Sequence, residues 1–246
     1  MNISISAETL FHIGSFPVTN SMLISWIIIV FLCVGAYAVS RNLATVPRGF
    51  QNVVEVIIQF LFGIVDSVMG NKEQTKKFFP LIATIFLFII LTNWTELLPG
   101  MGSVGLWEEH EGKRIIVPFI RASAADLNFT IALSLISVIT IQVVGVMSIG
   151  FGKYISKFLN FKSPISFFVG ILELISEVAK LVSFSFRLFG NIFAGEVLLI
   201  VMYTLVPYIV PLPFLALELF VGFIQALVFS MLTIVFIKMA TEEAHH

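Results

Sequence analysis

The stretch "SFSFRLFGN", residues 183–191, puts one arginine, Arg187, inside a run of residues that is otherwise mostly apolar. The apolar context extends from residue 164 to residue 236 with few interruptions, which places Arg187 at the depth of a lipid bilayer. A central arginine costs about 2.5 to 3.5 kcal/mol on membrane-insertion scales. A charge at that depth is therefore expected to have a specific partner or a function.

The composition is that of a polytopic membrane protein. Of the 246 residues, 58% are hydrophobic and only 12% are charged, whereas a soluble domain of this length needs far more charged surface. The net charge of -1 argues against nucleic acid as a partner, because phosphate backbones bind basic patches. With Cys33 as the one cysteine, a disulfide or a thiolate metal cluster within one chain is excluded, and we expect no metal and no cofactor.

The hydropathy pattern predicts one membrane domain over residues 1–246. The segment 1–20 has no Lys or Arg, so it lacks the basic region of a cleaved signal and is expected to be kept as an outer N-terminal segment. A run of about 20 apolar residues spans a hydrocarbon core of about 30 Å. Five such crossings are expected, at 21–40, 78–99, 127–150, 165–201 and 213–238.

Between the first two crossings, Gln51, Glu55 and Gln59 recur at i, i+4 and i+8 and give a helix one polar face. This spacing predicts an amphipathic helix over 45–70 that lies at the membrane interface. A sixth, short spanning helix is the alternative.

The fourth segment, 165–201, is too long for an upright crossing. It amounts to about 54 Å of helix at about 1.5 Å per residue, and tilts of up to about 40° do not absorb that length. Because no proline interrupts the segment after Pro164, we expect an unbroken oblique helix, followed by a turn at "VPYIVPLP", 206–213. The predicted fold is therefore an all-α membrane protein whose last two helices form a long, strongly tilted hairpin.

The basic residues of the short loops predict the orientation. With the N-terminus outside and the C-terminus cytoplasmic, the outer side receives only Lys113, Arg114 and Arg121. The cytoplasmic side then receives the larger set: Arg41, Arg48, Lys72, Lys76, Lys77, Lys153, Lys157, Lys162 and Lys238.

The polar residues of the fourth segment form a stripe. They step by four, three, seven and four residues, which keeps them along one helix face; they are Glu173, Glu177, Lys180, Arg187 and Asn191. Glu196 lies nine residues beyond Arg187, on the opposite face, and so cannot pair with it from the same helix. In the last segment, Glu218 and Gln225 share a face because they are seven residues apart.

Two interpretations of this stripe are open. In the structural one, Glu218 neutralises Arg187 and the pair joins two helices. In the functional one, the carboxylates of Glu173, Glu196 and Glu218 carry a proton or bind sodium. Arginine is effectively never deprotonated, so Arg187 acts there as a fixed positive charge that separates two aqueous half-paths.

Three further acidic residues are candidates for a channel mouth: Glu96, Asp126 and Glu177. The alternative for Glu96 and Asp126 is a plain interface or loop position. For Glu173 and Glu177 it is a side chain that reaches to the lipid headgroups.

The sequence resembles a known family at several places. "SFSFRLFGNIFAGE", 183–196, closely resembles the "SLxLRLFGNxxAGE" signature of subunit a of the F-type ATP synthase. "QNVVEVIIQF", "FFPLIATIFLFIILTNWTELLPG", "ADLNFTIALSL", "ILELIS" and "QALVFSMLTIVFIKMATEE" look like successive blocks of that family, in order. The chain departs from it at Lys180, which precedes a leucine and not a proline, and at "SAADLN", where "PTADxN" is usual.

The resemblance implies a non-catalytic membrane stator beside a rotating ring of c subunits, with two offset half-channels for the coupling ion, expected to be the proton. It implies that Arg187 faces the ring carboxylate and that Glu173 lies near the cytoplasmic half-channel. The positions that match the outer half-channel are Asn191, Glu196, Glu218 and Gln225.

The resemblance also implies three partners and a location. The partners are the c-subunit ring carboxylate, the peripheral stalk subunit b and the lipid bilayer, and the location is an energy-coupling membrane, expected to be the bacterial plasma membrane. If the stripe meets the ring, Leu188 and Asn191 should face it, whereas Ile192 and Gly195 should face elsewhere.

Two rival functions remain open. One is a secondary transporter with Arg187 as an anion site, and the other is a purely structural assembly subunit. Secondary transporters usually show internal repeats, and none is evident between the halves of this sequence.

Overall fold

The computed structural model describes residues 7–41, 43–95, 97–98, 105–110, 113–118, 121–158, 163–206 and 209–242. Helices dominate these residues: α1 (Asn20–Arg41), α2 (Phe50–Met69), α3 (Lys72–Thr95), α4 (Leu127–Ile149), α5 (Phe151–Phe158), α6 (Pro164–Leu205) and α7 (Pro211–Glu242). Six of them, all except α5, are long and apolar enough to cross a membrane. The expected all-α membrane class is confirmed.

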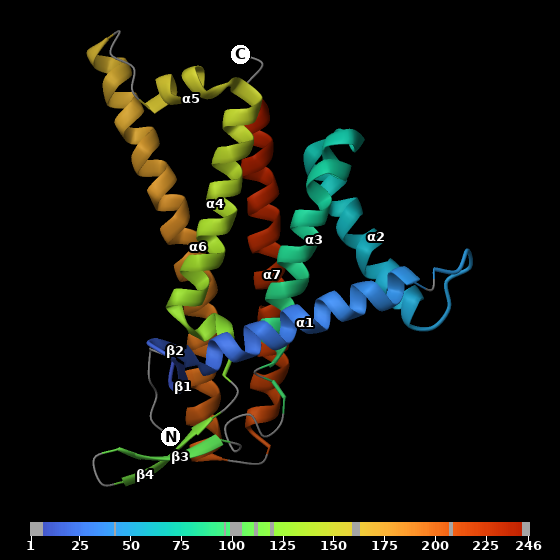
Figure 1. Ribbon diagram of the computed structural model, residues 1–246, viewed down its shortest axis with the longest axis vertical. Helices are drawn as coiled ribbons and strands as arrows, with labels where there is room; N and C mark the ends of the chain where they lie inside the picture. Colours follow the sequence, from blue (N-terminus) through green and yellow to red (C-terminus); the bar gives the residue numbers. More distant parts are fainter. Residues whose placement is uncertain are drawn as a thin grey trace.

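Two short hairpins were not predicted from the sequence. β1 (Thr9–Ile13) pairs antiparallel with β2 (Phe16–Thr19), and β3 (Gly105–His110) pairs antiparallel with β4 (Lys113–Pro118). Both lie at the end of the molecule where the N-terminus is found (Figure 1). Strands of four to six residues are too short for an alternating pattern to distinguish them from loops.

The core is formed where α7 packs against α3, α4 and α6 (Figure 1). Phe184 of α6 is buried, with its ring centroid 4.9 Å from that of Phe229 and 5.9 Å from that of Phe236, both on α7. Leu188 and Ile192 continue this buried face of α6 at 0% and 1% exposure. One face of α6 is thus fixed by its own chain, and the polar stripe runs along the border of that face.

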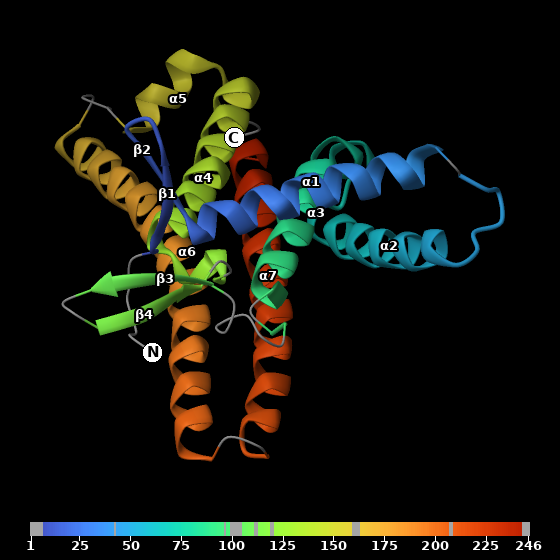
Figure 2. The same cartoon turned by 60° about the horizontal axis from the view of Figure 1, so that its bottom comes forward.

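The last two helices are longer than the expected apolar segments. α6 is a single helix of 42 residues, about 63 Å at about 1.5 Å per residue, and α7 has 32 residues. Figure 2 shows the two running side by side toward the turn that joins them, with α6 leaning away from α7 at its other end. The expectation of one unbroken helix after Pro164 is therefore confirmed.

α1 crosses the direction of the α6–α7 pair (Figures 1 and 2). Its first half contacts the bundle and buries Ser21, Ile24, Ser25 and Ile28. Its second half exposes large apolar side chains, with Phe31 at 62% and others of similar exposure. Because such a surface is unfavourable in water, this half of α1 is suited to lipid.

α2 packs on α3 and projects from the bundle (Figure 2). Leu61, Val65 and Met69 are its buried residues. Gln51 and Glu55 lie on one face in the first turns of the same helix, where Gln51 Nε2 donates to Glu55 Oε1 at 2.7 Å. They are two of the three polar residues expected on one face of the interfacial helix. By length and composition α2 also qualifies as a crossing, so the alternative of a sixth span stays open.

α3 begins earlier than the expected crossing at 78–99. Its first turns contain Lys72, Lys76 and Lys77, which the hydropathy pattern assigns to water. They are helical nonetheless because Asn71 caps the helix: its Oδ1 accepts from Glu73 N at 2.9 Å.

Candidate functional site

Arg187 lies on the exposed side of α6. Its Nη2 donates to Ser183 Oγ, one turn earlier, at 3.2 Å. Within the described residues Arg187 forms no ion pair, and the carboxyl of Glu218 packs against Gly195 instead. The structural pair of Arg187 with Glu218 is therefore wrong, and the guanidinium is open to a partner outside this chain.

The surface around Arg187 is made of small side chains. Ala179, Ser183, Gly190 and Ala194 are all exposed along this side of α6. Toward the start of the helix it continues as a shallow apolar hollow, lined by Leu174, Ile175, Val178, Ala179, Val182 and Ser183. Small residues let a second helix approach closely, so this side is shaped for helix packing.

The expectation that Leu188 also faces outward is wrong. Leu188 is fully buried, whereas Asn191 is exposed as expected. The reason is helical: one residue rotates the chain by about 100°, which carries Leu188 from the exposed side to the core beside Phe184. Ile192 is buried, in agreement with its expected direction.

Asn191 joins α6 to α7. Its Nδ2 donates to Gln225 Oε1 at 2.7 Å. The Gln225 Nε2 is buried and has no hydrogen-bond partner among the described residues. A buried amide donor of this kind needs a hydrogen-bond acceptor at the site, such as a water molecule.

Glu218 of α7 is 7% exposed and packs directly on Gly195 of α6. A Cβ at position 195 would lie only 2.6 Å from Glu218 Cδ, so the absence of a side chain is what admits the carboxyl. Glu218 also lies close enough to Glu196 for their charges to interact. The α6–α7 hairpin therefore brings the two carboxyls together.

Glu196 forms an ion pair with Arg121, which follows β4 in the chain. Arg121 Nη2 lies 3.3 Å from Glu196 Oε2, and the two side chains are 8% and 22% exposed. Sequence reasoning missed Arg121 and counted it only as an outer loop charge. No spacing signal identifies this pair, because Arg121 and Glu196 are 75 residues apart in the sequence and meet only through the segment before α4, which packs on α6.

The acidic residues near the start of α6 have partners on neighbouring helices. Glu173 Oε1 lies 2.9 Å from Lys157 Nζ of α5. Glu177 Oε1 accepts from Lys180 Nζ at 2.7 Å, and Glu177 Oε2 accepts from Gln142 Nε2 of α4 at 2.6 Å. Both carboxyls therefore face the chain's own helices, on the far side of Arg187 from Glu196 and Glu218.

Asp126 is buried at the start of α4, where its Oδ1 accepts from Asn128 N at 3.0 Å and caps the helix. Its Oδ2 accepts from Ser21 Oγ of α1 at 2.7 Å. These contacts give it a structural role in holding α1 to the bundle. Glu96, the third candidate for a channel mouth, lies outside the described residues.

No group of three or more His, Cys, Asp or Glu side chains in the described part of the chain is arranged to hold a metal ion. What the helices bring together is a line of carboxyl, amide and cationic side chains along the α6–α7 pair. Such ionisable residues at membrane depth are rare and mark ion pathways. Fold and site together define a multi-pass membrane protein with a polar path along a long helix hairpin.

Comparison with known proteins narrows this class to a family. Residues 22–238 match the family model described as ATP synthase A chain. The chain is 31% identical over 228 residues to ATP synthase subunit a of Moorella thermoacetica, covering 93% of both chains. It is 32% identical over 246 residues to the subunit a of Trichlorobacter lovleyi, covering 99% of this chain and 96% of that one. The chain belongs to the ATP synthase A chain family.

Proposed function

We propose that this chain translocates the coupling ion, the proton, through two offset half-paths beside a rotating ring of small subunits in an ATP synthase complex. It performs no bond-making chemistry of its own; it couples ion flow to rotation and thereby to ATP synthesis. The observation that carries the proposal is the exposed guanidinium of Arg187 between two separate groups of carboxyls on the same long helix.

The two groups of carboxyls are far apart along α6. From Glu173 to Glu196 the helix extends about 35 Å, at about 1.5 Å per residue, with Arg187 between them. The group beyond Arg187, with Glu196, Glu218, Asn191 and Gln225, lines the outer half-path in this proposal, and Glu173 belongs to the inner one. An ion that crosses must therefore leave one half-path, travel on a partner and enter the other.

Arg187 controls the protonation of the ring carboxylate as it moves between the two half-paths. Its charge is permanent, so it favours the ionised form of a ring carboxylate that faces it and cannot pass a proton itself. A ring carboxylate therefore gives up its proton on one side of Arg187 and takes one up on the other. The exposed Arg187, held to Ser183 by one hydrogen bond, is free to make that contact.

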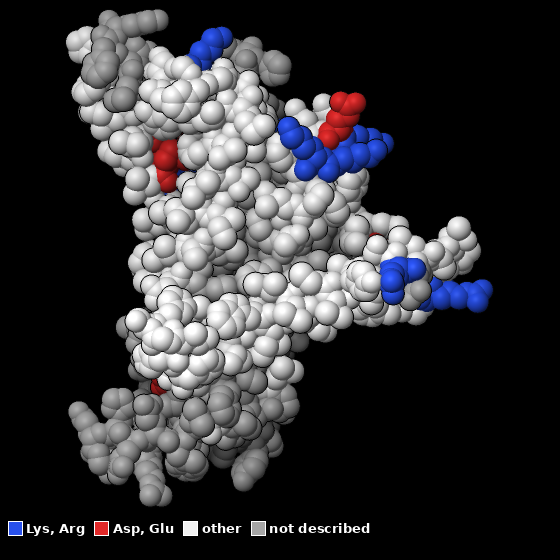
Figure 3. Space-filling model, in the orientation of Figure 1, with Lys and Arg blue, Asp and Glu red and all other residues white. Residues whose placement is uncertain are grey.

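In the membrane we place the N-terminus outside and the C-terminus in the cytoplasm. The described Lys and Arg side chains visible in Figure 3 gather at the top and at the right, over α5 and the α2–α3 end and at the end of α1. A membrane with its cytoplasmic face there is crossed obliquely by the α6–α7 pair. This arrangement accommodates the length of α6, which exceeds the hydrocarbon thickness about twofold.

The proposal includes the partners that the family resemblance implies. The ring contributes the carboxylate that faces Arg187, the exposed apolar residues of α1 and α6 face lipid or neighbouring subunits, and the peripheral stalk subunit b is the stator partner. Because the similar subunit a chains come from bacteria, the energy-coupling membrane is the bacterial plasma membrane.

The test is ATP-driven proton pumping and ATP synthesis in membranes that contain the assembled complex. Arg187→Ala abolishes both while the subunit stays assembled. Arg187→Lys also fails, because a titratable ammonium on a flexible stem does not replace the planar guanidinium. Arg41→Ala, at the end of α1, is the matched control and retains both activities. Wild-type synthesis rates in Arg187→Ala membranes contradict the proposal.

A further inference from the structure

The short helix α5 bridges the ends of α4 and α6 at the top of Figure 1. Two glycines let it sit closely against both helices. A Cβ at Gly145 of α4 would lie 2.7 Å from Cε2 of Tyr154, and a Cβ at Gly170 of α6 would lie 2.9 Å from the carbonyl carbon of Phe158. α5 is therefore fixed in place against backbone on both sides.

Tyr154 is the centre of this contact and leads to Glu177. The residue is 7% exposed, and its hydroxyl donates to Gln142 Oε1. The Gln142 amide then donates from Nε2 to Glu177 Oε2 at 2.6 Å. With its oxygen held by Tyr154, the amide of Gln142 presents its NH₂ group to Glu177. The carboxyl is thus oriented from α5 through α4.

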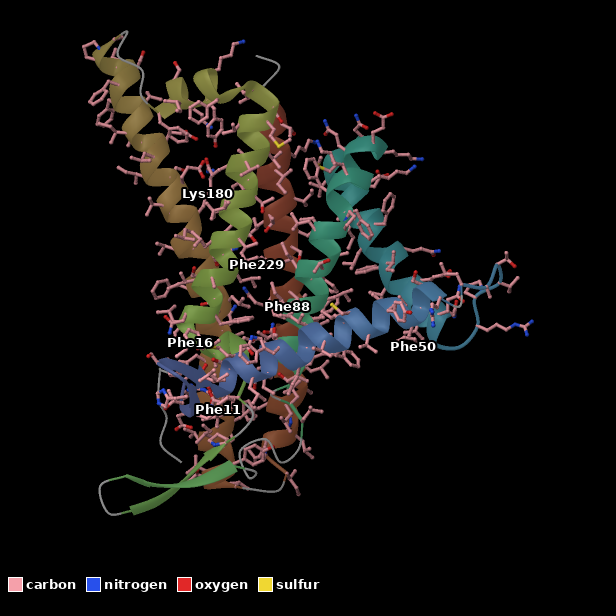
Figure 4. All side chains as sticks on the ribbon, viewed as in Figure 1. Phe11, Phe16, Phe50, Phe88, Lys180 and Phe229 are labelled. Atoms are coloured by element: carbon pink, nitrogen blue, oxygen red, sulfur yellow. The ribbon has the colours of Figure 1, made fainter. Side chains whose placement is uncertain are left out.

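The other carboxyl oxygen of Glu177 is held from α6 itself. Lys180 Nζ donates to Oε1 at 2.7 Å and lies 4.9 Å from the ring centroid of Phe236 on α7. Figure 4 labels Lys180 on the side of α6 that faces α4. The polar groups facing Glu177 are therefore Lys180 from α6, Gln142 from α4 and, through it, Tyr154 from α5.

α5 reaches a second carboxyl one turn earlier on α6. Lys157 Nζ lies 2.9 Å from Glu173 Oε1, with the side chains 27% and 30% exposed. One eight-residue helix thus contacts or orients both acidic residues at the start of α6. They are the two carboxyl side chains of α6 that precede Arg187.

We propose that α5 is a positioning element for the inner half-path, in which Tyr154 and Gln142 orient Glu177 and Lys157 orients Glu173. This inference rests on the proposed function of the chain. The two carboxyls are held at the border of the α6 side that carries Arg187. A proton that leaves toward the cytoplasm reaches a carboxyl that α5 orients. The hydroxyl of Tyr154 holds the amide of Gln142 in place, and this amide in turn holds the carboxyl of Glu177.

The experiment uses the complete complex in membranes with Tyr154→Phe. The substitution keeps the ring against Gly145 and removes only the hydroxyl. Passive proton flow is measured while the pH is varied on the cytoplasmic side and then on the outer side. We expect about tenfold slower flow, corresponding to about 1.4 kcal/mol in the barrier, and a displaced dependence on cytoplasmic pH, with the dependence on outer pH unchanged. Tyr37→Phe, an exposed tyrosine on α1, is the matched control and has the wild-type profiles.

A second set of variants covers the case in which Tyr154→Phe reduces assembly. Lys157→Gln removes a partly exposed contact on the cytoplasmic side and also displaces the cytoplasmic pH dependence, whereas Lys157→Arg, which keeps a cation beside Glu173, retains the wild-type dependence. Two results contradict the positioning role and leave α5 a purely structural one. Either both Tyr154→Phe and Lys157→Gln keep the wild-type dependence of proton flow on cytoplasmic pH, or both slow proton flow equally at every pH on both sides. If Arg187→Ala membranes still pump, the proposed function fails instead.

Discussion

Glu218 on α7 and Gly195 on α6 are in direct contact, with the carboxyl of one against the Cα of the other. The contact is possible only without a side chain at position 195, and it places Glu218 next to Glu196, with which its charge interacts. Two carboxyls from the two arms of the α6–α7 hairpin thereby share one site. A single substitution at Gly195 is expected to separate them.

Gly195→Ala is predicted to move the Glu218 carboxyl without unfolding the chain. The atoms that the new methyl meets belong to the end of a flexible side chain, and alanine is the better helix former by about 1 kcal/mol. We expect normal assembly and about tenfold slower ATP-driven proton pumping, a change of about 1.4 kcal/mol in the barrier. Gly63→Ala in α2, where a Cβ meets nothing within 4 Å, is the control. Equal pumping by both variants contradicts the role given to this contact.

Glu196 and Glu218 are predicted to act as a coupled pair. Carboxyls that share a site release their protons in steps that belong to the pair, so substitutions at the two positions do not add. Glu218→Gln should slow transport and change its dependence on outer pH, and Glu196→Gln should do the same. The double variant should be worse than either single one but better than the product of their effects. The measurement is proton flow against outer pH, and wild-type profiles in both single variants speak against a relay.

Arg121 is predicted to matter through Glu196. Removing one member of a poorly exposed ion pair leaves the other without its compensating charge. Arg121→Gln should therefore slow transport severalfold, while Arg121→Gln combined with Glu196→Gln should be no worse than Glu196→Gln alone. Arg48→Gln, near the start of α2, serves as a control that removes one charge elsewhere. Strictly multiplicative effects of the two substitutions on the rate contradict a functional pair.

Much of the fold could be predicted because apolar length and periodicity report directly on helices in membranes. The unbroken α6 follows from the absence of proline after Pro164, and the side of α6 that carries Arg187 follows from the spacing of its polar residues. The short elements could not be predicted in this way. α5 has only eight residues, and β1 to β4 are too short for a pattern to separate them from loops.

The candidate site was predictable only in part. The approach of Glu196 to Glu218 could be inferred from an antiparallel hairpin, since both lie near its turn. The partners Arg121, Gln142 and Tyr154 could not, because each contact joins residues that are distant in the sequence. Leu188 shows that a neighbour in the sequence need not share the exposed side of a helix. It directly follows Arg187, but the rotation of about 100° per residue turns it into the core.

The central claim is that the Arg187 side of α6 meets a ring carboxylate of a partner subunit, and disulfide crosslinking tests it most directly. In a Cys33→Ser background, cysteine is introduced by Gly190→Cys, at an exposed position where a Cβ meets nothing within 4 Å. A second cysteine is placed beside the buried carboxylate of the ring subunit, and the assembled complex is oxidised in membranes. Ile192→Cys, 1% exposed, and Val34→Cys on α1, 60% exposed, are the buried and lipid-facing controls. The account predicts a crosslink from Gly190→Cys and none from either control; no crosslink from Gly190→Cys, together with one from Val34→Cys, contradicts it.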